Sequence, residues 1–253
     1  MVLSLPATPS LDDRTVQGSV KTLYDQVQLH VENFYANVDV KLTSDVAKSL
    51  SALQTPYLPD SVASVIASSK TPSPVIKHCL AYMVTQSISV SSGTQLTLLP
   101  PVYAAMVTGS NLSTAEGVDA VARRQAFSKW KELTAYFMPD PFKNPESIAS
   151  RDSVISSMVQ IFSDAFLLWD SHPTDEASAR QHLVELLRNA ADVATMLFAQ
   201  ASAFEFRWQQ PSSQDGSKKR SLVVVPACLK VVDDRGQRLE RPQGMTQAVM
   251  ERI

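Results

Sequence analysis

Apolar residues recur at three- and four-residue steps near the start of the chain. The repeat comprises Val20, Leu23, Tyr24, Val27, Val31, Phe34, Tyr35 and Val38. At about 100° per residue these positions fall within an arc of roughly 120°, which is the apolar stripe of an amphipathic helix. Charged residues such as Lys21, Asp25 and Glu32 lie on the opposite face. We therefore predict a helix that has Ser19 as its N-cap.

The segments that follow predict three more helices, and the third of them is apolar on nearly every side. Short helices are expected over residues 44–53 and 60–68. Pro74 then stands at the first helical position, where proline is favoured, and opens the segment Val75–Val84. This segment is apolar nearly all round, and a helix of that kind is usually buried on every side. We expect it to lie at the middle of a helical bundle.

The middle of the chain predicts helices whose apolar stripes continue over several turns. A short helix opens at Pro100–Pro101, and a capping box at Ser113–Glu116 starts a long helix that stops before Pro139. The long helix is expected to turn these residues inward: Val118, Val121, Ala122, Ala126, Trp130, Leu133 and Phe137. Two further helices are expected, from Asn144 to Trp169 and from Asp175 to Phe206.

The composition changes after Trp208. The β-branched runs Leu222–Val225 and Cys228–Val232 read as strands, and Asp233–Gly236 has the chemistry of a hairpin turn. Residues 245–253 form either a third strand or a helical turn. The sequence thus predicts a mainly α fold, a multi-helix bundle of about seven or eight helices with a small C-terminal β-hairpin appendage. Its parts are a flexible N-terminal segment over 1–18, the bundle over 19–210, a polar linker over 211–220 and a β-hairpin tail over 221–253 that packs on the bundle.

Glycine content supports this assignment. The chain has 253 residues and 7 glycines, which is under half of the usual share of about 7%. Sandwiches, barrels and Rossmann sheets use glycine at turns and phosphate loops, so they are disfavoured. A helical protein needs few glycines.

Charge and cysteine content narrow the class of protein. The 23 Lys and Arg residues nearly balance the 25 Asp and Glu residues, so we expect no binding to nucleic acid. Two cysteines are too few for a disulfide framework and favour a reducing compartment. The N-terminus lacks the features of a signal peptide, and no apolar run of about 18 residues is present. We expect a soluble, cytoplasmic protein without a transmembrane segment.

Motifs that carry chemistry are scarce. Asp12–Val16 and Asp233–Gln237 resemble the start of a magnesium-binding carboxylate motif but lack its last carboxylate. Four histidines, at positions 30, 78, 172 and 182, share no metal-binding spacing. We interpret His30 as a boundary histidine that bonds a neighbouring loop. We therefore predict no metal and no cofactor, and the catalytic residues, if any exist, stay unknown.

Aromatic residues gather on the predicted inner faces, and two interpretations stay open. They form either a packed core or the lining of an apolar pocket between helices, where bundles place ligands. The candidates for a pocket lining are Tyr24, His30, Phe34, Tyr82, Trp130, Phe162, Trp169 and Phe204.

Three stretches of the chain resemble a family of uncharacterised filamentous-fungal proteins. They are Leu23–Tyr35, Leu197–Trp208 and Val223–Gly236, and they bracket most of the sequence. The resemblance implies an ascomycete origin and a helical body with a C-terminal β-appendage. It transfers no catalytic residue to any position of this chain.

Two functions are consistent with these observations. The first is a soluble helical binding protein whose partner is another protein, a second copy in a homodimer, or an apolar small molecule. The alternative is an enzyme of fungal secondary metabolism, similar to a terpene cyclase, that encloses an apolar substrate among its inner aromatic residues.

Overall fold

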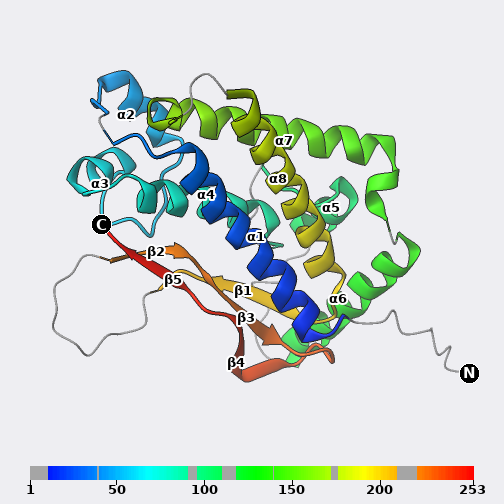
Figure 1. Ribbon diagram of the computed structural model, residues 1–253. Helices are drawn as coiled ribbons and strands as arrows, with labels where there is room; N and C mark the ends of the chain where they lie inside the picture. The colour runs from blue at the N-terminus through cyan, green and yellow to red at the C-terminus, as the bar shows by residue number, and fades with distance from the viewer. Residues whose placement is uncertain are drawn as a thin grey trace, which may run out of the picture.

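The computed structural model describes residues 11–38, 40–90, 96–109, 118–138, 140–171, 176–209 and 221–253. Within these ranges the chain forms eight α-helices, two short 3₁₀-helices and five strands (Figure 1). The helical elements are α1 (Asp13–Phe34), α2 (Ser44–Ser51), α3 (Val62–Ser68), α4 (Ser73–Ile88), α5 (Pro101–Gly109), α6 (Val118–Phe137), η1 (Pro141–Lys143), α7 (Pro145–Phe166), η2 (Leu167–Trp169) and α8 (Glu176–Ala199). The mainly α fold with a C-terminal β-appendage is confirmed.

Helix α1 begins earlier than the sequence pattern indicated. Asp12 caps it by accepting a hydrogen bond from the Thr15 amide at 2.8 Å, and Val16 extends the buried stripe by one turn. Part of the segment over 1–18 that was predicted to be flexible is therefore helical, and Ser19 is not the N-cap. The capping box at Ser113–Glu116 and the linker over 211–220 lie outside the described residues.

Helix α4 lies at the centre of the fold, as its apolar sequence predicted. It is buried on nearly every side and packs against α1, α8 and the strand β2 (Ser221–Val225). Thr85 of α4 donates its hydroxyl proton to the Ala81 carbonyl, so the Tyr24 hydroxyl of α1 donates to the Thr85 oxygen at 2.7 Å. The hydroxyl groups of Tyr24 and Thr85 are thus both hydrogen-bonded inside the core.

Helix α6 turns a different face inward from the one predicted. Val121 and Phe137 are 40% and 72% exposed, and the buried side chains of this helix are those of Ser128 and Lys131. Helix α6 packs chiefly on α8, where Trp130 contacts Phe198, and its Lys131 donates to the Ser202 carbonyl. Because lysine is a charged residue, the apolar pattern of the sequence could not mark Lys131 as buried.

The helix predicted to run to Phe206 ends at Ala199. Residues Ala203–Arg207 form strand β1, which pairs antiparallel with β3 (Ala227–Val232). The segment Phe204–Arg207 alternates aromatic and charged side chains, and that period of two is typical of a strand. The boundary at residue 210 that was predicted for the helical bundle therefore lies beyond the last helix.

The five strands form two small antiparallel sheets. One has the order β1-β3-β4, where β4 spans Arg238–Thr246, and the other pairs β2 with β5 (Val249–Arg252). The predicted turn at Asp233–Gly236 joins β3 to β4, and residues 245–253 finish β4 and form β5 rather than a helical turn. Gly236 has a φ of +73° and lies so close to α6 that an added Cβ would be 2.9 Å from the Gln125 Cα atom. Glycine is required there because of the positive φ and because of the close contact with Gln125.

The sheets lie along one side of the helices, next to α1 and α4 (Figure 1). Lys77 of α4 joins the two layers, because its ammonium group is 2.6 Å from Glu32 of α1 and 2.7 Å from Glu251 of β5. One hydrophobic core includes residues of both the helices and the strands. Among the described helices, none is both long and apolar enough to cross a bilayer.

Candidate functional site

The eight candidates for a pocket lining do not gather at one place. Tyr24, His30, Phe162 and Trp169 are buried, and Phe34, Tyr82, Trp130 and Phe204 are half-buried. His30, Phe34 and Phe162 belong to one aromatic group, which Phe166 extends to Trp169. Trp130 contacts Phe198 at another place in the molecule. None of the eight lines either of the two clefts described below.

His30 is a core residue and not the boundary residue that was predicted. Its Nδ1 atom is 3.1 Å from Nδ1 of His182 on α8, so one ring donates and the other accepts. Burial, and then the neighbouring His182, lower the pKa of His30 to about 3. Nε2 of His30 has no hydrogen-bond partner. His30 is therefore a neutral imidazole whose Nε2 atom is buried in the core, and we assign it a structural role.

A cleft of about 660 Å³ opens between the loop that precedes α3 and the strand β2. It is lined by Tyr57, Leu58, Pro59, Asp60, Ser64, Val65, Ser68, Trp208, Ser221, Leu222, Val223 and Ile253. Sequence reasoning named none of these as a site residue. The available signals were weak, since Tyr57 is an aromatic residue between Pro56 and Pro59, and Trp208 stands where the composition changes.

Aromatic rings form one wall of this cleft. Tyr57 stacks on Trp208 with ring centroids 5.6 Å apart and planes 18° apart. Tyr82 and His78 then contact Trp208 edge-on from within the molecule. Tyr57 is 46% exposed whereas Trp208 is 5% exposed. In this wall the exposed ring of Tyr57 is therefore supported by the buried ring of Trp208.

His78 of α4 holds two walls of the cleft in position. Its Nδ1 donates to the Val223 carbonyl of β2 at 2.7 Å, because a carbonyl can only accept. Its Nε2 then accepts from the Thr55 hydroxyl at 2.8 Å, and the Tyr57 amide donates to the same hydroxyl oxygen at 3.1 Å. Burial lowers the pKa of His78 to about 4, so the ring is neutral at pH 7.

Asp60 is the one side chain charged at pH 7 among the described residues that line the cleft. Its carboxylate accepts from the Ser64 hydroxyl at 2.6 Å and from the Ser61 amide at 2.7 Å. These two hydrogen bonds, with that of Ser64 the stronger, hold the pKa of Asp60 below its usual value. The cleft therefore carries a negative charge on the side opposite β2.

A second cleft, of about 560 Å³, lies between the first turns of α1 and the last turns of α8. Asn189 and Asp192 of α8 line it. Asn189 donates its amide to Gln26 of α1 at 2.7 Å. Asn189 therefore joins the two helices beside this cleft.

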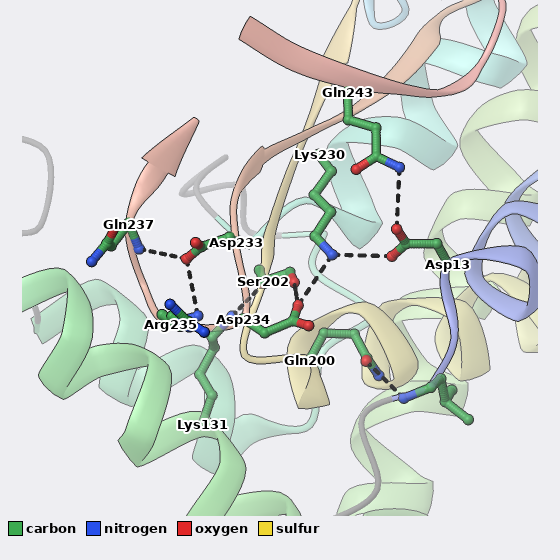
Figure 2. A network of polar contacts seen from close by, with 11 residues as sticks. Asp13, Lys131, Gln200, Ser202, Lys230, Asp233, Asp234, Arg235, Gln237 and Gln243 are labelled. Atoms are coloured by element: carbon green, nitrogen blue, oxygen red, sulfur yellow. Dashed lines mark hydrogen bonds and ion pairs between the residues drawn. The ribbon is translucent and has the colours of Figure 1, made fainter. Parts of the chain in front are cut away.

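A network of polar side chains connects α1, α6 and the strands β3 and β4 (Figure 2). Lys230 of β3 lies 3.1 Å from both Asp13 of α1 and Asp234 of the turn. Gln243 of β4 donates to the second oxygen of Asp13. On the other side, Asp234 accepts from the Ser202 hydroxyl. The network joins the β-appendage to the N-terminal end of α1.

Lys131 extends this network to α6. Its ammonium group is buried and donates to the Ser202 carbonyl at 3.0 Å, and burial lowers the pKa of Lys131 to about 8. A lysine with a lowered pKa beside a serine can act as a base for a nucleophile. Here, however, the lysine bonds the backbone carbonyl, the Ser202 hydroxyl donates to Asp234, and Ser202 is 2% exposed. This arrangement connects α6 to the segment before β1 and does not activate the serine.

The described residues contain no group of three or more His, Cys, Asp and Glu side chains that could hold a metal ion. Cys79 and Cys228 are both buried and unpaired. Burial raises the pKa of Cys228 to about 12 and raises that of Cys79 as well, so both are protonated thiols. Neither is placed to act as a nucleophile.

No family model, curated protein or solved structure matches this chain. The resemblance to fungal proteins therefore stays a prediction. The geometry and the chemistry of the cleft are the observations that bear on the function.

Proposed function

We propose that this protein is a binding protein that holds a small ligand in the cleft between the loop before α3 and the strand β2. The observation that carries the proposal is the support of both walls by a single buried group. His78 bonds Val223 on one wall and, through Thr55, the Tyr57 loop on the other. Walls that are fixed before a ligand arrives lose less entropy on binding.

The size and the lining of the cleft support the same function. Ligand sites usually have volumes of roughly 300–1,000 Å³ and combine apolar walls with a few polar groups. The cleft measures about 660 Å³ and combines two aromatic rings with a carboxylate. The alternative function, an enzyme that encloses an apolar substrate, draws no support from the eight predicted residues, which lie outside the cleft.

The experiment is a thermal-shift screen with a chemically diverse set of small molecules, repeated on a variant with a filled cleft. Ser68→Trp places an indole at the wall, and Ser157→Trp on α7 is the matched control. Both serines are exposed, and each donates its hydroxyl to a backbone carbonyl of its own helix. We expect compounds that raise the melting temperature of the wild type and of Ser157→Trp but not of Ser68→Trp. Equal responses of the two variants, or no response of the wild type, would contradict the proposal.

We also propose that the protein acts in a reducing compartment, the cytoplasm, and that it binds no nucleic acid. The support is the pair of free, buried cysteines and the near balance of charge. A homodimer is the protein partner that the sequence leaves open, and sedimentation at several concentrations tests it. A single species with the mass of one chain would exclude the homodimer.

A further inference from the structure

We infer that the ligand of this cleft is a protonated alkylamine, a small organic cation that carries N–H donors. The inference rests on the proposed function and assigns a chemical class to its ligand. It follows from three features of the lining, which are the sign of its charge, the direction of its hydroxyl hydrogen bonds and its exposed aromatic ring.

The charge of the cleft favours a cation. Asp60 is ionised at pH 7, and the described lining residues include no lysine, arginine or histidine. Among the lining residues that the structure describes, an anionic ligand would meet a carboxylate and no cation. A cation would instead find its counter-ion at the wall.

The serines on the same side of the cleft offer acceptors. A hydroxyl has one proton. Ser64 donates that proton to Asp60 at 2.6 Å, and Ser68 donates it to the Val65 carbonyl at 3.1 Å. Only the lone pairs of the two oxygens remain for a ligand. Together with the carboxylate they form a set of acceptors on α3 and the loop before it, and an ammonium group supplies the matching donors.

The exposed ring of Tyr57 completes the match. Trp208 supports this ring on one side, and 46% of the residue is exposed. A cation near an aromatic face is attracted by the ring quadrupole. The alkyl chain of an amine can then lie along Leu222 and Val223, which line the cleft on the β2 side.

The test is isothermal titration of the full-length protein with three ligands of equal chain length, which are hexylamine, 1-hexanol and hexanoate. We expect hexylamine to bind about three- to thirtyfold more tightly than 1-hexanol, from an ion pair and a cation–π contact at a partly exposed site. Hexanoate should bind most weakly. The preference for hexylamine should decrease as the salt concentration rises.

Two variants and two matched controls separate the contribution of the Asp60 charge to amine binding from that of the Tyr57 ring. Asp60→Asn keeps an acceptor for the Ser61 amide and should weaken hexylamine binding about twofold to fivefold while leaving 1-hexanol unchanged. Asp164→Asn, an exposed aspartate on α7, is its control. Tyr57→Leu should weaken hexylamine more than 1-hexanol. Its control is Tyr136→Leu, since Tyr136 is 45% exposed on α6.

The outcomes distinguish the two proposals. If 1-hexanol or hexanoate binds as tightly as hexylamine, or if Asp60→Asn leaves hexylamine binding unchanged, the amine class is wrong while a ligand site at the cleft stands. If all three ligands bind the wild type and Ser68→Trp equally, the cleft is not the site and both proposals fail. Melting temperatures of the variants show that each remains folded.

Discussion

The buried lysine on α6 should affect the stability of the protein, and the size of this effect can be calculated from the structure. Lys131 is 4% exposed, and its ammonium group bonds only a carbonyl among the contacts described above. Burial lowers the pKa of Lys131 from 10.5 to about 8. At about 1.36 kcal/mol per pH unit, this difference means that the folded state disfavours the charged lysine by about 3 kcal/mol. The charge is a cost to stability at pH 7.

Replacement of Lys131 by methionine, which is similar in length, removes that cost. It also leaves the Ser202 carbonyl without its donor, which costs about 1–3 kcal/mol. We therefore expect Lys131→Met to raise the free energy of unfolding at pH 7, by up to about 2 kcal/mol. Urea unfolding followed by circular dichroism measures this change.

The pH dependence is a sharper test, because the lost hydrogen bond cancels from it. Between pH 8 and pH 10.5 the unfolded state binds more protons at Lys131 than the folded state does, so wild-type stability rises with pH in this window. From pH 7 to pH 9 the advantage of Lys131→Met over the wild type should fall by about 1 kcal/mol. The control is Lys129→Met, since the Lys129 side chain is 55% exposed. If Lys131→Met has the same advantage at both pH values, Lys131 has an ordinary pKa and the argument is wrong.

Three further predictions follow from other parts of the fold. The pKa values of His30 and His78, about 3 and about 4, lie below the unfolded value of 6.5. Stability is therefore complete above pH 6.5 and should fall by about 2 kcal/mol for each histidine by pH 5 in urea titrations, with a flat profile contradicting the burial argument. Trp169→Ala should lower the free energy of unfolding by about 3–5 kcal/mol in the same assay, because the side chain is 1% exposed, and a change below 1 kcal/mol would mean that the ring is not packed in the core. Gly236→Ala should lower it by about 1–3 kcal/mol, because the residue has a positive φ and lies against Gln125. A melting temperature equal to that of the wild type would refute this last expectation.

The parts of the fold that local pattern determines were predictable. The central helix α4 follows from its all-round apolar sequence, and the Asp233–Gly236 turn follows from residues that favour turns. Strand β1 was missed because the apolar stripe of α8 leads directly into it. The alternation of side chains that marks it covers only Ala203–Arg207, which is too short to override the helical pattern before it.

The candidate site was not predictable, because it depends on contacts between distant segments. Tyr57 and Trp208 are separated by most of the chain, and only the fold brings their rings together. The sequence marked His78 only as one of four histidines that share no metal-binding spacing. Its role depends on Thr55 and the Val223 carbonyl, and a bond to a backbone carbonyl leaves no trace in sequence composition.

The two adjacent polar residues of α4 have a consequence for folding in the cell. Lys77 and His78 take partners from the C-terminal strands, 174 and 145 residues further along the chain. During synthesis the central helix is therefore complete long before Glu251 and Val223 exist to satisfy it. Until they arrive, an ammonium group and an imidazole at the centre of the molecule lack those bonds. The set of bonds that α4 makes in the folded protein is therefore complete only after the strands β2 and β5 have been translated.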